Sequence, residues 1–462
     1  MSKRGTTQQL SRDGSFFGDG SNELSENDKP RQATAAQLVK RKLKPLKGRP
    51  RVAPYDLARD AQKWVAKIRR ENGGVSREVE AGMKRDYPEA WEVLQSVRRK
   101  LGSAAKTLAT DLYSKDTQYL YELIQNADDN QYTRAEANAE EPYICFSLYP
   151  DQLVIDCNED GFTAENVKAI CGIGQSTKTA PQGCVGEKGI GFKSVFKIAQ
   201  RVHIQSGFYS FSFEHTRDSD DEGLGMVTPM TEPFKDLPKD VITRITLTLL
   251  SSVDLRTLVD ELSNVPDTLL LFVKKLRSIL VNIYPETGDS TQLVYSCPQD
   301  PARGFKTVEK QSRSNDGEWI VEKRHFRVTR RTIKGLPHDT SRKQTEADVL
   351  LAFPVNETGD EAILQGQHVF AYSPIRPVGF NFLIQSDFIT QAGREVVVHS
   401  PRNKALLSGV AKTFRDAVLE FCAHKKLQYQ WMSSSTVSEL GSSTSPTSLT
   451  DFRPISRDLT QR

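Results

Sequence analysis

Apolar residues in the first half of the chain recur at two different spacings. Between residues 55 and 113 they return every three or four positions, as at Leu57, Ala61, Trp64 and Ile68. This spacing is typical of amphipathic helices, whereas the alternation that follows from Ile144 onward is typical of strands. The pattern therefore predicts a helical lead-in at residues 53–113, followed by a domain of mixed helices and strands.

Residues 114–250 carry the alternating segments of that domain. The predicted strands are residues 144–148, 153–155, 202–204, 208–213 and 243–250. Turn residues at 149–151 and at Ser206-Gly207 predict that the first four form two hairpins. Thr163, with Asn166 three positions later, predicts the N-cap of a helix that buries Val167 and Ile170. We expect a mixed sheet backed by helices on one face, an α+β two-layer sandwich.

Residues 251–427 repeat the mixture of helix and strand and predict a second α/β domain. Helices are expected at residues 255–271 and 403–422. Strands are expected at residues 319–328, 349–353, 368–372 and 380–384. Residues 301–317 and 334–346 are polar and predict loops.

Both ends of the chain lack the apolar residues that a core needs. Residues 1–52 are rich in Ser, Gly, Gln, Lys and Arg, and residues 433–462 are rich in Ser and Thr. Such compositions predict disorder. The basic cluster within residues 40–51 is typical of a nuclear import signal or a nucleic-acid contact, and equally of a solvated linker.

Composition narrows the class of protein. The 462 residues include 63 basic and 59 acidic ones, so the whole chain is not a polycation. No apolar run is long enough to span a bilayer, and no secretory signal opens the chain. Six cysteines occur without a C-x-x-C pair, which favours reduced thiols over a disulfide frame or zinc site. We expect an intracellular protein, cytoplasmic or nuclear, with no membrane partner.

The stretch Glu-Leu-Ile-Gln-Asn-Ala-Asp-Asp-Asn at residues 122–130 carries the first candidate chemistry. Glu122, Asn126 and Asp129 are four and then three residues apart, so a helix places them on one face. Leu123 and Ile124 belong to the opposite, apolar stripe. The helix can therefore pack on a sheet and direct two carboxylates and an amide toward a ligand.

About sixty residues later the chain reads Gly186-Glu-Lys-Gly189-Ile-Gly191-Phe192-Lys193-Ser194. Glycine has no Cβ, so its backbone can approach a polyphosphate closely and present N–H groups to it, best where a helix begins. Each motif alone recurs by accident, as a solvated helix face or a tight turn. Their order, with Asn158-Glu-Asp-Gly161 and Gly174-Gln-Ser-Thr-Lys between them, is more informative.

This ordered set resembles the GHKL ATPases, which include the ninety-kilodalton heat-shock chaperone, gyrase B and the histidine kinases. The wording of the two motifs is most similar to the sacsin and NO VEIN branch. The resemblance covers roughly residues 105–425 and implies a Bergerat-type ATP-binding fold at residues 114–250. It also implies ATP and Mg²⁺ as cofactors.

The resemblance assigns roles to the first helix. Glu122 would orient the water that attacks the γ-phosphate, and Asn126 would hold Mg²⁺ together with the nucleotide phosphates. An amide oxygen suits this ion, which keeps few protein ligands in nucleotide sites. Asp129 would lie near adenine or ribose, or cap local backbone.

The adenine-reading turn departs from the family pattern D-x-G-x-G. Aligning Gly161 with the last glycine puts Cys157 at the aspartate and Glu159 at the first glycine. A thiol is a poor substitute, so Asp156 and Asn158 remain alternatives, and Asn158 is the preferred one. Thr243 matches the threonine that closes the adenine pocket in the chaperone, or is a strand residue chosen for its branching.

The resemblance also implies a set of phosphate contacts and one distant arginine. The phosphate contacts are Ser176, Thr177, Gly186, Gly189, Gly191, Phe192 and Lys193. Lys193 is equally well read as an exposed residue. Arg394 resembles the arginine that stabilises transition-state charge in the chaperone, with Arg402 as the alternative.

Three functions remain open. The first is a slow, Mg-ATP-dependent ATPase that works as a conformational switch, with a protein client or partner. The second is a degenerate nucleotide-binding scaffold without turnover, which Cys157 favours. The third is a nuclear DNA- or chromatin-associated ATPase, which rests on the basic segment alone. A histidine kinase is disfavoured because no phospho-acceptor histidine helix precedes residue 122.

Overall fold

The computed structural model describes residues 54–110, 118–172, 191–215, 223–298, 304–313, 317–339, 342, 344–391 and 396–431. The chain divides into two units, residues 1–44 and 45–462, and every described residue belongs to the second. The predicted disordered segments at residues 1–52 and 433–462 lie outside this part of the chain.

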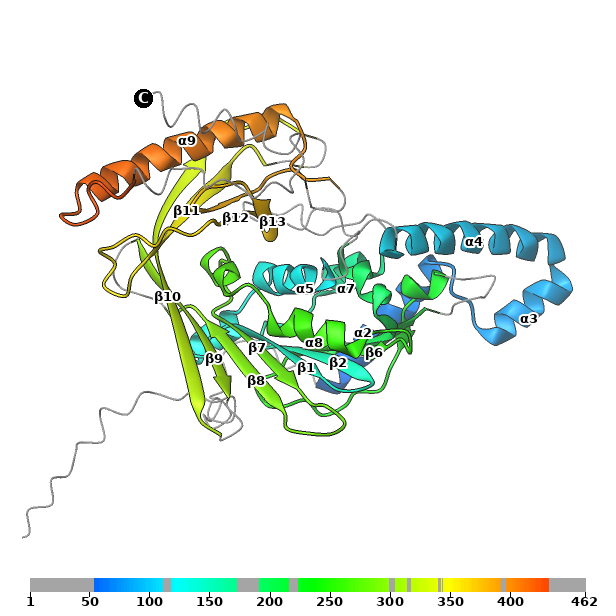
Figure 1. Ribbon diagram of the computed structural model, residues 1–462. Helices are drawn as coiled ribbons and strands as arrows, with labels where there is room; N and C mark the ends of the chain where they lie inside the picture. Colours follow the sequence, from blue (N-terminus) through cyan, green and yellow to red (C-terminus); the bar gives the residue numbers. More distant parts are fainter. Residues whose placement is uncertain are drawn as a thin grey trace, which may run out of the picture. The chain divides into compact units, whose positions relative to one another are not determined.

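The predicted helical lead-in consists of three helices, and the prediction is confirmed within the described residues. They are α2 (Pro54–Glu71), α3 (Arg77–Asp86) and α4 (Pro88–Thr110). Val65 and Ile68 lie on the apolar face of α2 and are buried. Ser76 is the N-cap of α3, and its side chain accepts a hydrogen bond from the Val79 N–H. Figure 1 shows α3 and α4 in succession as a helical pair.

The next segment holds the elements around the two motifs. They are α5 (Gln118–Asp129), α6 (Thr133–Ala137), β1 (Tyr143–Leu148), β2 (Gln152–Cys157), α7 (Ala164–Cys171), the 3₁₀ helix η1 (Gly191–Lys197), β3 (Ala199–Ser206), β4 (Tyr209–Glu214), the 3₁₀ helix η2 (Leu224–Met226), β5 (Met230–Thr231) and β6 (Thr243–Leu249). Both predicted hairpins are confirmed, since β1 pairs with β2 and β3 pairs with β4. Thr163 caps α7 in a reciprocal box with Asn166, as predicted.

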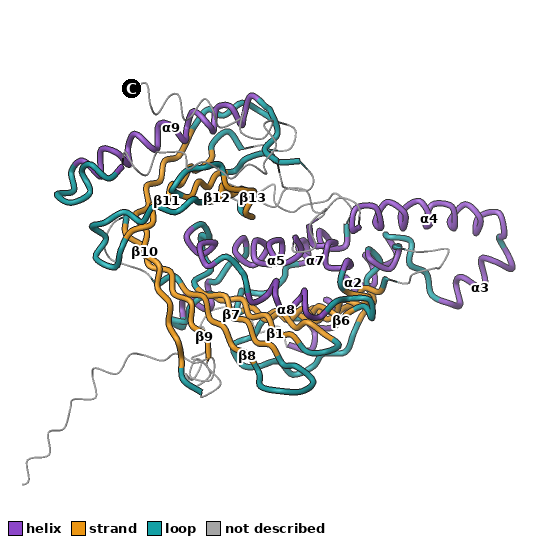
Figure 2. Tube along the Cα trace, viewed as in Figure 1, coloured by secondary structure: helices purple, strands orange, loops and turns teal. Residues whose placement is uncertain are grey.

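The remaining elements follow Leu249. They are α8 (Leu255–Ser263), the 3₁₀ helix η3 (Asp267–Leu271), β7 (Ser278–Ile283), β8 (Thr291–Ser296), β9 (Phe305–Arg313), β10 (Trp319–Ile333), β11 (Ala347–Val355), β12 (His368–Ala371), β13 (Ser373–Pro377), β14 (Leu383–Ser386) and α9 (Pro401–Cys422). The mixture of helix and sheet predicted from the sequence is confirmed. Figure 2 shows the strands of this half of the chain running on from those of the first half.

Two predictions in this half are wrong. The single helix expected over residues 255–271 is α8 and η3, because α8 ends at Ser263 and Pro266 lacks the N–H that would continue it. The loop expected over residues 301–317 contains β9, which pairs with both β8 and β10. Its polar side chains are half-buried rather than alternating with apolar ones, so periodicity could not reveal it.

All 14 of these strands form one hydrogen-bonded sheet, in the order β13-β12-β14-β11-β10-β9-β8-β7-β1-β2-β6-β3-β4-β5. The strand β7 lies beside β1 and runs parallel to it. The sheet therefore passes through the predicted boundary at residue 250. A separate two-layer sandwich over residues 114–250 is not what this strand order shows.

Two apolar cores pack on this sheet. The larger includes Leu120, Leu123 and Ile124 of α5 together with side chains of β1, β2, β3, β4 and β6. The smaller lies beneath α9 and includes Leu406, Val410 and Phe414. The strand β11 serves both, since Leu350 belongs to the first and its neighbour Leu351 to the second. Alternation along a strand therefore separates the two cores.

Candidate functional site

Helix α5 carries residues 122–129 of the first polar motif, and most of the side chains of this helix are buried. Leu120, Leu123 and Ile124 pack in the larger core, and the Glu122 side chain is only 4% exposed. The Gln118 amide donates a hydrogen bond to Glu122 Oε1 at 3.3 Å. The packing of the apolar stripe therefore fixes the direction of the Glu122 carboxylate.

Gly191, the last glycine of the second motif, lies directly against that carboxylate. A Cβ placed on Gly191 would stand 1.9 Å from Glu122 Oε2 and 2.5 Å from Cδ. No other amino acid fits this approach without moving the backbone or the carboxylate. The structure thus brings together Glu122 and Gly191, which are separated by about seventy residues in the sequence.

The 3₁₀ helix η1 begins at Gly191 and is anchored immediately behind it. The Ser194 hydroxyl donates to the Gly191 carbonyl at 2.6 Å, and Phe192 is buried in the larger core. Lys193 is 2% exposed, and its ammonium donates to the carbonyl oxygens of Ile170 at 2.7 Å and Met226 at 2.5 Å. The sequence reading of Lys193 as an exposed residue is therefore wrong.

The other polar residues of α5 divide between two environments. Asn126 and Asp129 are half-buried. Asp128, between them, is buried, and its carboxylate accepts hydrogen bonds from the N–H groups of Lys274, Lys275 and Leu276. Burial raises the pKa of Asp128, while these N–H groups lower it. Asp128 therefore ties the end of α5 to the segment before β7.

Two of the three candidates for the adenine-reading position are engaged on opposite faces of the sheet. Asp156 forms a two-point ion pair with Arg244 of β6, at 2.6 Å for both N–O distances. Its neighbour Cys157 points to the helical face, where its thiol lies 3.2 Å from the Tyr132 hydroxyl. Burial raises the pKa of Cys157 to about 12, so the group is a neutral thiol.

Asn158, the preferred candidate, makes backbone contacts with both ends of its amide. Its Oδ1 accepts from the Tyr143 N–H, and its Nδ2 donates to the Glu141 carbonyl, each at 2.9 Å. The side chain is 3% exposed. Asn158 therefore fixes the backbone at the start of β1, and its assignment as an adenine contact stays a prediction.

Glu159, which the alignment placed at a glycine, is the buried carboxylate of this turn. It is 2% exposed, and its Oε1 accepts hydrogen bonds from the hydroxyls of Thr243 and Ser206. Its Oε2 accepts from the Gly161 N–H at 3.0 Å. Burial raises the pKa of Glu159 above its ordinary value, while the Thr243 hydroxyl and the Gly161 N–H lower it. The structure thus joins Glu159, Gly161 and Thr243 in one cluster.

Gly161 is required by the geometry of the same turn. Its φ is +94°, in the left-handed region that favours glycine. A Cβ would also meet Ile242 Cγ2 at 3.3 Å and the Gly207 backbone at 3.5 Å. Gly161 therefore shapes the turn that carries Glu159.

Five predicted site residues lie outside the described part of the chain. They are Ser176, Thr177, Gly186, Gly189 and Arg394. On either side of Arg394, Gln391 N–H donates to the Val396 carbonyl at 3.0 Å, and Val398 N–H donates to the Ile389 carbonyl at 2.8 Å. The alternative, Arg402, has a fully buried side chain paired with Asp387 at 3.2 Å. Its guanidinium is already engaged within the protein.

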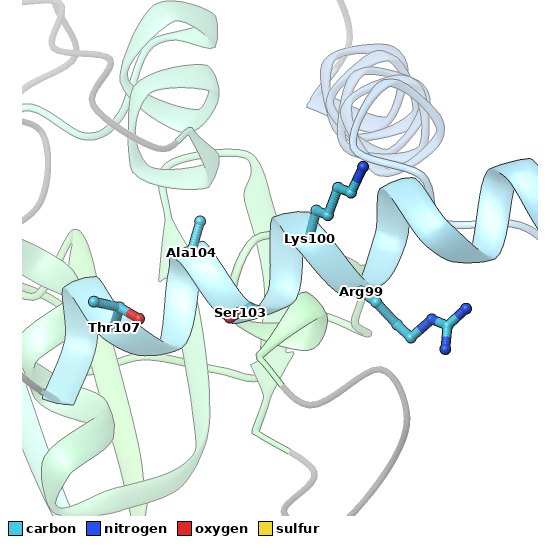
Figure 3. Close-up of a pocket in the computed structure, with 5 residues that line it drawn as sticks. All are labelled: Arg99, Lys100, Ser103, Ala104 and Thr107. Atoms are coloured by element: carbon cyan, nitrogen blue, oxygen red, sulfur yellow. The ribbon is translucent and has the colours of Figure 1, made fainter.

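A separate hollow of about 640 Å³ lies along α4 and is open to solvent. Figure 3 shows the side chains that line it, with Arg99 and Lys100 extending apart from the helix. The lining residues are Arg99, Lys100, Ser103, Ala104 and Thr107. All five are exposed, so nothing in the described structure fixes their side chains on a ligand.

Two absences can be stated for the described residues alone. They contain no cluster of three or more His, Cys, Asp or Glu side chains placed to hold a metal ion. None of the helices within these ranges is long and apolar enough to cross a membrane.

The sequence reading missed Glu159 and the burial of Lys193. A glutamate in a polar turn is usually solvated, and only the strand register reveals its neighbours. Because Cys157 pairs with Thr243 and Ser206 also pairs with Thr243, the three strand ends converge on this turn. Pairing the predicted strands would have been the signal for the cluster.

Comparison with known proteins gives one informative match. No family model matches the chain. The chain is 32% identical to Protein NO VEIN of Arabidopsis thaliana over 351 residues, which are 72% of this chain and 12% of that protein. Over this stretch the chain is NO VEIN-like, and it spans only a small part of the length of that relative.

Proposed function

We propose that the chain is a Mg-ATP-binding module that hydrolyses ATP slowly and changes conformation with the bound nucleotide. Its first half would be a Bergerat-type site of the GHKL class built onto the long sheet. The observation that carries the proposal is the approach of Gly191 to the Glu122 carboxylate, because it joins the two motifs in space. A partner protein would sense the conformational change.

The phosphate side supports a nucleotide site. Because Gly191 has no Cβ, its backbone lies against the Glu122 carboxylate, and η1 begins there. The first N–H groups of a helix lack partners within the helix, which favours an anion. Phe192 contributes the next N–H of the same turn. A polyphosphate bound here would lie beside Glu122, so Glu122 would orient and deprotonate a water molecule on that side.

Asn126 is the residue proposed to hold Mg²⁺. It lies one turn after Glu122 on the same helix face and is half-buried, and its amide oxygen is a ligand type that Mg²⁺ accepts. Bound Mg²⁺ would neutralise charge on the phosphate oxygens. Asp129 would add a polar contact one turn further along α5.

Glu159 and Thr243 are proposed to form the base side. Glu159 Oε1 is held by two hydroxyls, while Oε2 receives one backbone N–H, so Oε2 has capacity for one further donor. The amino group of adenine is such a donor. This assignment replaces the preferred candidate Asn158, whose amide bonds to backbone groups at both ends, and the alternative Asp156, whose carboxylate is paired with Arg244.

A scaffold without turnover is the second candidate function. It is favoured by the buried thiol of Cys157 and by the backbone contacts that occupy both ends of Asn158. In that case Glu159 would be a structural carboxylate whose hydrogen bonds all go to groups of the protein. Nucleotide would then bind weakly or not at all.

The test is to measure Mg-ATP binding and phosphate release for the wild-type chain and for Glu122→Gln. The glutamine keeps the size of the side chain and an acceptor for Gln118, but it cannot take a proton. We expect nucleotide affinity within about threefold of wild type and phosphate release lowered by about 100-fold, the usual range for losing a general base.

The matched control is Glu136→Gln, the same change at an exposed position on α6. It should leave both measurements unchanged. Equal phosphate release by wild type and Glu122→Gln would overturn the role of Glu122. Absence of Mg-ATP binding by the wild-type chain would overturn the ATPase and favour the scaffold.

A further inference from the structure

Lys193 is a buried cation with an unusual set of partners. Its side chain is 2% exposed, and the groups that contact its ammonium carry no formal charge. Two hydrogen bonds go to the carbonyl oxygens of Ile170 and Met226. The ring of Phe213 lies beneath the ammonium, with Nζ 4.5 Å from its centroid.

Among the described residues, none of the ion pairs involves Lys193. Cys171 on α7 is the titratable side chain that acts on it electrostatically. Strand β4 contributes Phe213, η2 contributes a carbonyl, and on α5 Glu122 lies against Gly191 instead. A buried ammonium is normally paired with an anion, and the part of the chain that the structure describes supplies none to Lys193.

An apolar side chain of the same length would fill this space without the cost of burying a charge. Burial lowers the pKa of Lys193 to about 8, which reflects that cost. The cation also lies two residues after Gly191, on the short helix that begins there. A polyanion bound at Gly191 would supply the absent counter-charge from the adjacent side.

We propose that Lys193 is a positioning and electrostatic residue for a polyphosphate at the Gly191 turn, which it attracts by its buried charge without touching the ligand. Its two carbonyl contacts join η1 to the end of α7 and to η2, and so hold Gly191 against Glu122. The field of the ammonium is screened less by the protein than by water. The proposal deepens the proposed function and rests on it for the identity of the ligand.

The experiment measures binding of Mg-ATP, and separately of inorganic tripolyphosphate, to the full chain and to Lys193→Met at pH values on either side of 8. Methionine fills the same space and removes the charge. At the lower pH we expect Lys193→Met to bind either probe about tenfold more weakly. Wild-type affinity should fall as pH rises through about 8, and the variant should show no such dependence.

The control is Lys168→Met, on the exposed side of α7. It removes an equal charge at a solvated position and should retain wild-type affinity and pH dependence. Folding of each variant is checked by its thermal unfolding transition, because a merely structural loss would lower affinity equally at every pH.

The outcomes separate the two proposals. Mg-ATP binding that is equal in wild type and Lys193→Met at every pH would overturn the role of Lys193 and leave the ATP site standing. Tripolyphosphate binding that depends on Lys193, with ATP bound no more tightly, would support Lys193 and overturn the ATP site. Wild-type protein that binds neither probe would overturn both.

Discussion

The two sides of the proposed nucleotide site are built differently. On the phosphate side, a carboxylate from α5 meets a bare glycine backbone at the start of η1. On the base side, the end of β2 and the turn after it contain four polar or thiol side chains that already bond to other parts of the protein. They are Asp156, Cys157, Asn158 and Glu159.

The difference shows which part of a binding site a sequence motif can specify. Approach to a phosphate requires the absence of a side chain, and a glycine records that requirement directly. Selection of a base requires a particular acceptor in a particular direction, and several residue types in a turn can supply one. A sequence motif can therefore specify the phosphate side, whereas the base side depends on how three strand ends come together in the fold.

The largest expected effect concerns the cation behind the phosphate side. Unfolded lysine keeps its proton up to its ordinary pKa of 10.5, whereas folded Lys193 loses it at about 8. The unfolded state therefore binds more protons between these pH values, and the free energy of unfolding should rise there. Relative to Lys193→Met, wild type should gain about 3 kcal/mol across this window, measured by denaturant unfolding without ligand.

Lys168→Met removes an equal charge from an exposed position on α7 and is the comparison for that measurement. If wild type and Lys193→Met differ by the same unfolding free energy at every pH in this window, burial does not shift the pKa of Lys193 and the prediction is wrong.

Gly191→Ala should have the next largest effect, on the phosphate side itself. The added Cβ would stand 1.9 Å from Glu122 Oε2, so either the carboxylate or the turn must move. We expect the affinity for Mg-ATP to fall by about 100-fold, or about 2.7 kcal/mol, as measured by calorimetry.

Gly82→Ala on α3 provides the matched change, because no atom lies within 4 Å of its new Cβ. It should keep wild-type affinity and stabilise the helix by about 0.5–1 kcal/mol. If Gly191→Ala binds Mg-ATP with wild-type affinity, the phosphate side does not depend on the absence of a side chain at this position.

Glu159→Gln tests the base side and should have a smaller effect. The amide nitrogen would replace one carboxylate oxygen and remove an acceptor from the turn, so ATP should bind about tenfold more weakly, a loss of about 1.4 kcal/mol. Affinity for tripolyphosphate should not change, since that probe has no base. Glu165→Gln, at an exposed position on α7, is the control. Equal losses for ATP and tripolyphosphate would indicate that Glu159 only supports the fold.

Tyr132→Phe should have the smallest effect, and only on stability. The Tyr132 hydroxyl donates to the Ala127 carbonyl at 2.9 Å and lies beside Cys157, so it links α5 to β2. Its loss should lower the free energy of unfolding by about 1 kcal/mol, with ATP affinity within about twofold of wild type. Tyr87→Phe, which changes a 68% exposed tyrosine, should alter neither quantity. A large loss of affinity in Tyr132→Phe would place the thiol side within the binding site.

The sequence predicted the elements whose apolar residues follow a clear period. The hairpins of β1–β2 and β3–β4 and the Thr163 cap are confirmed because short-range contacts decide them. Strand β9 was missed because its half-buried polar side chains do not alternate with apolar ones, although it pairs with the strands directly before and after it in sequence. The continuity of the 14-stranded sheet was missed for a different reason, since it depends on the long-range pairing of β1 with β7.

The candidate site divides in the same way. The order of the motifs predicted that Glu122 and the glycine stretch serve one site, and the structure places Gly191 against the Glu122 carboxylate. The motif order could not predict that the Glu159 side chain points inward to Thr243, because that contact depends on the pairing of β2 with β6. Nor could it predict the burial of Lys193, since the carbonyl groups that receive it come from α7 and η2.

Calorimetric titration of the wild-type chain with ATP, with Mg²⁺ present and then chelated, tests the central claim most directly. We predict saturable binding at a single site when Mg²⁺ is present. Without Mg²⁺ the binding should be at least about tenfold weaker, because the ion that Asn126 helps to hold is then missing. No saturable binding in either condition would contradict the claim that α5 and the Gly191 turn form a nucleotide site.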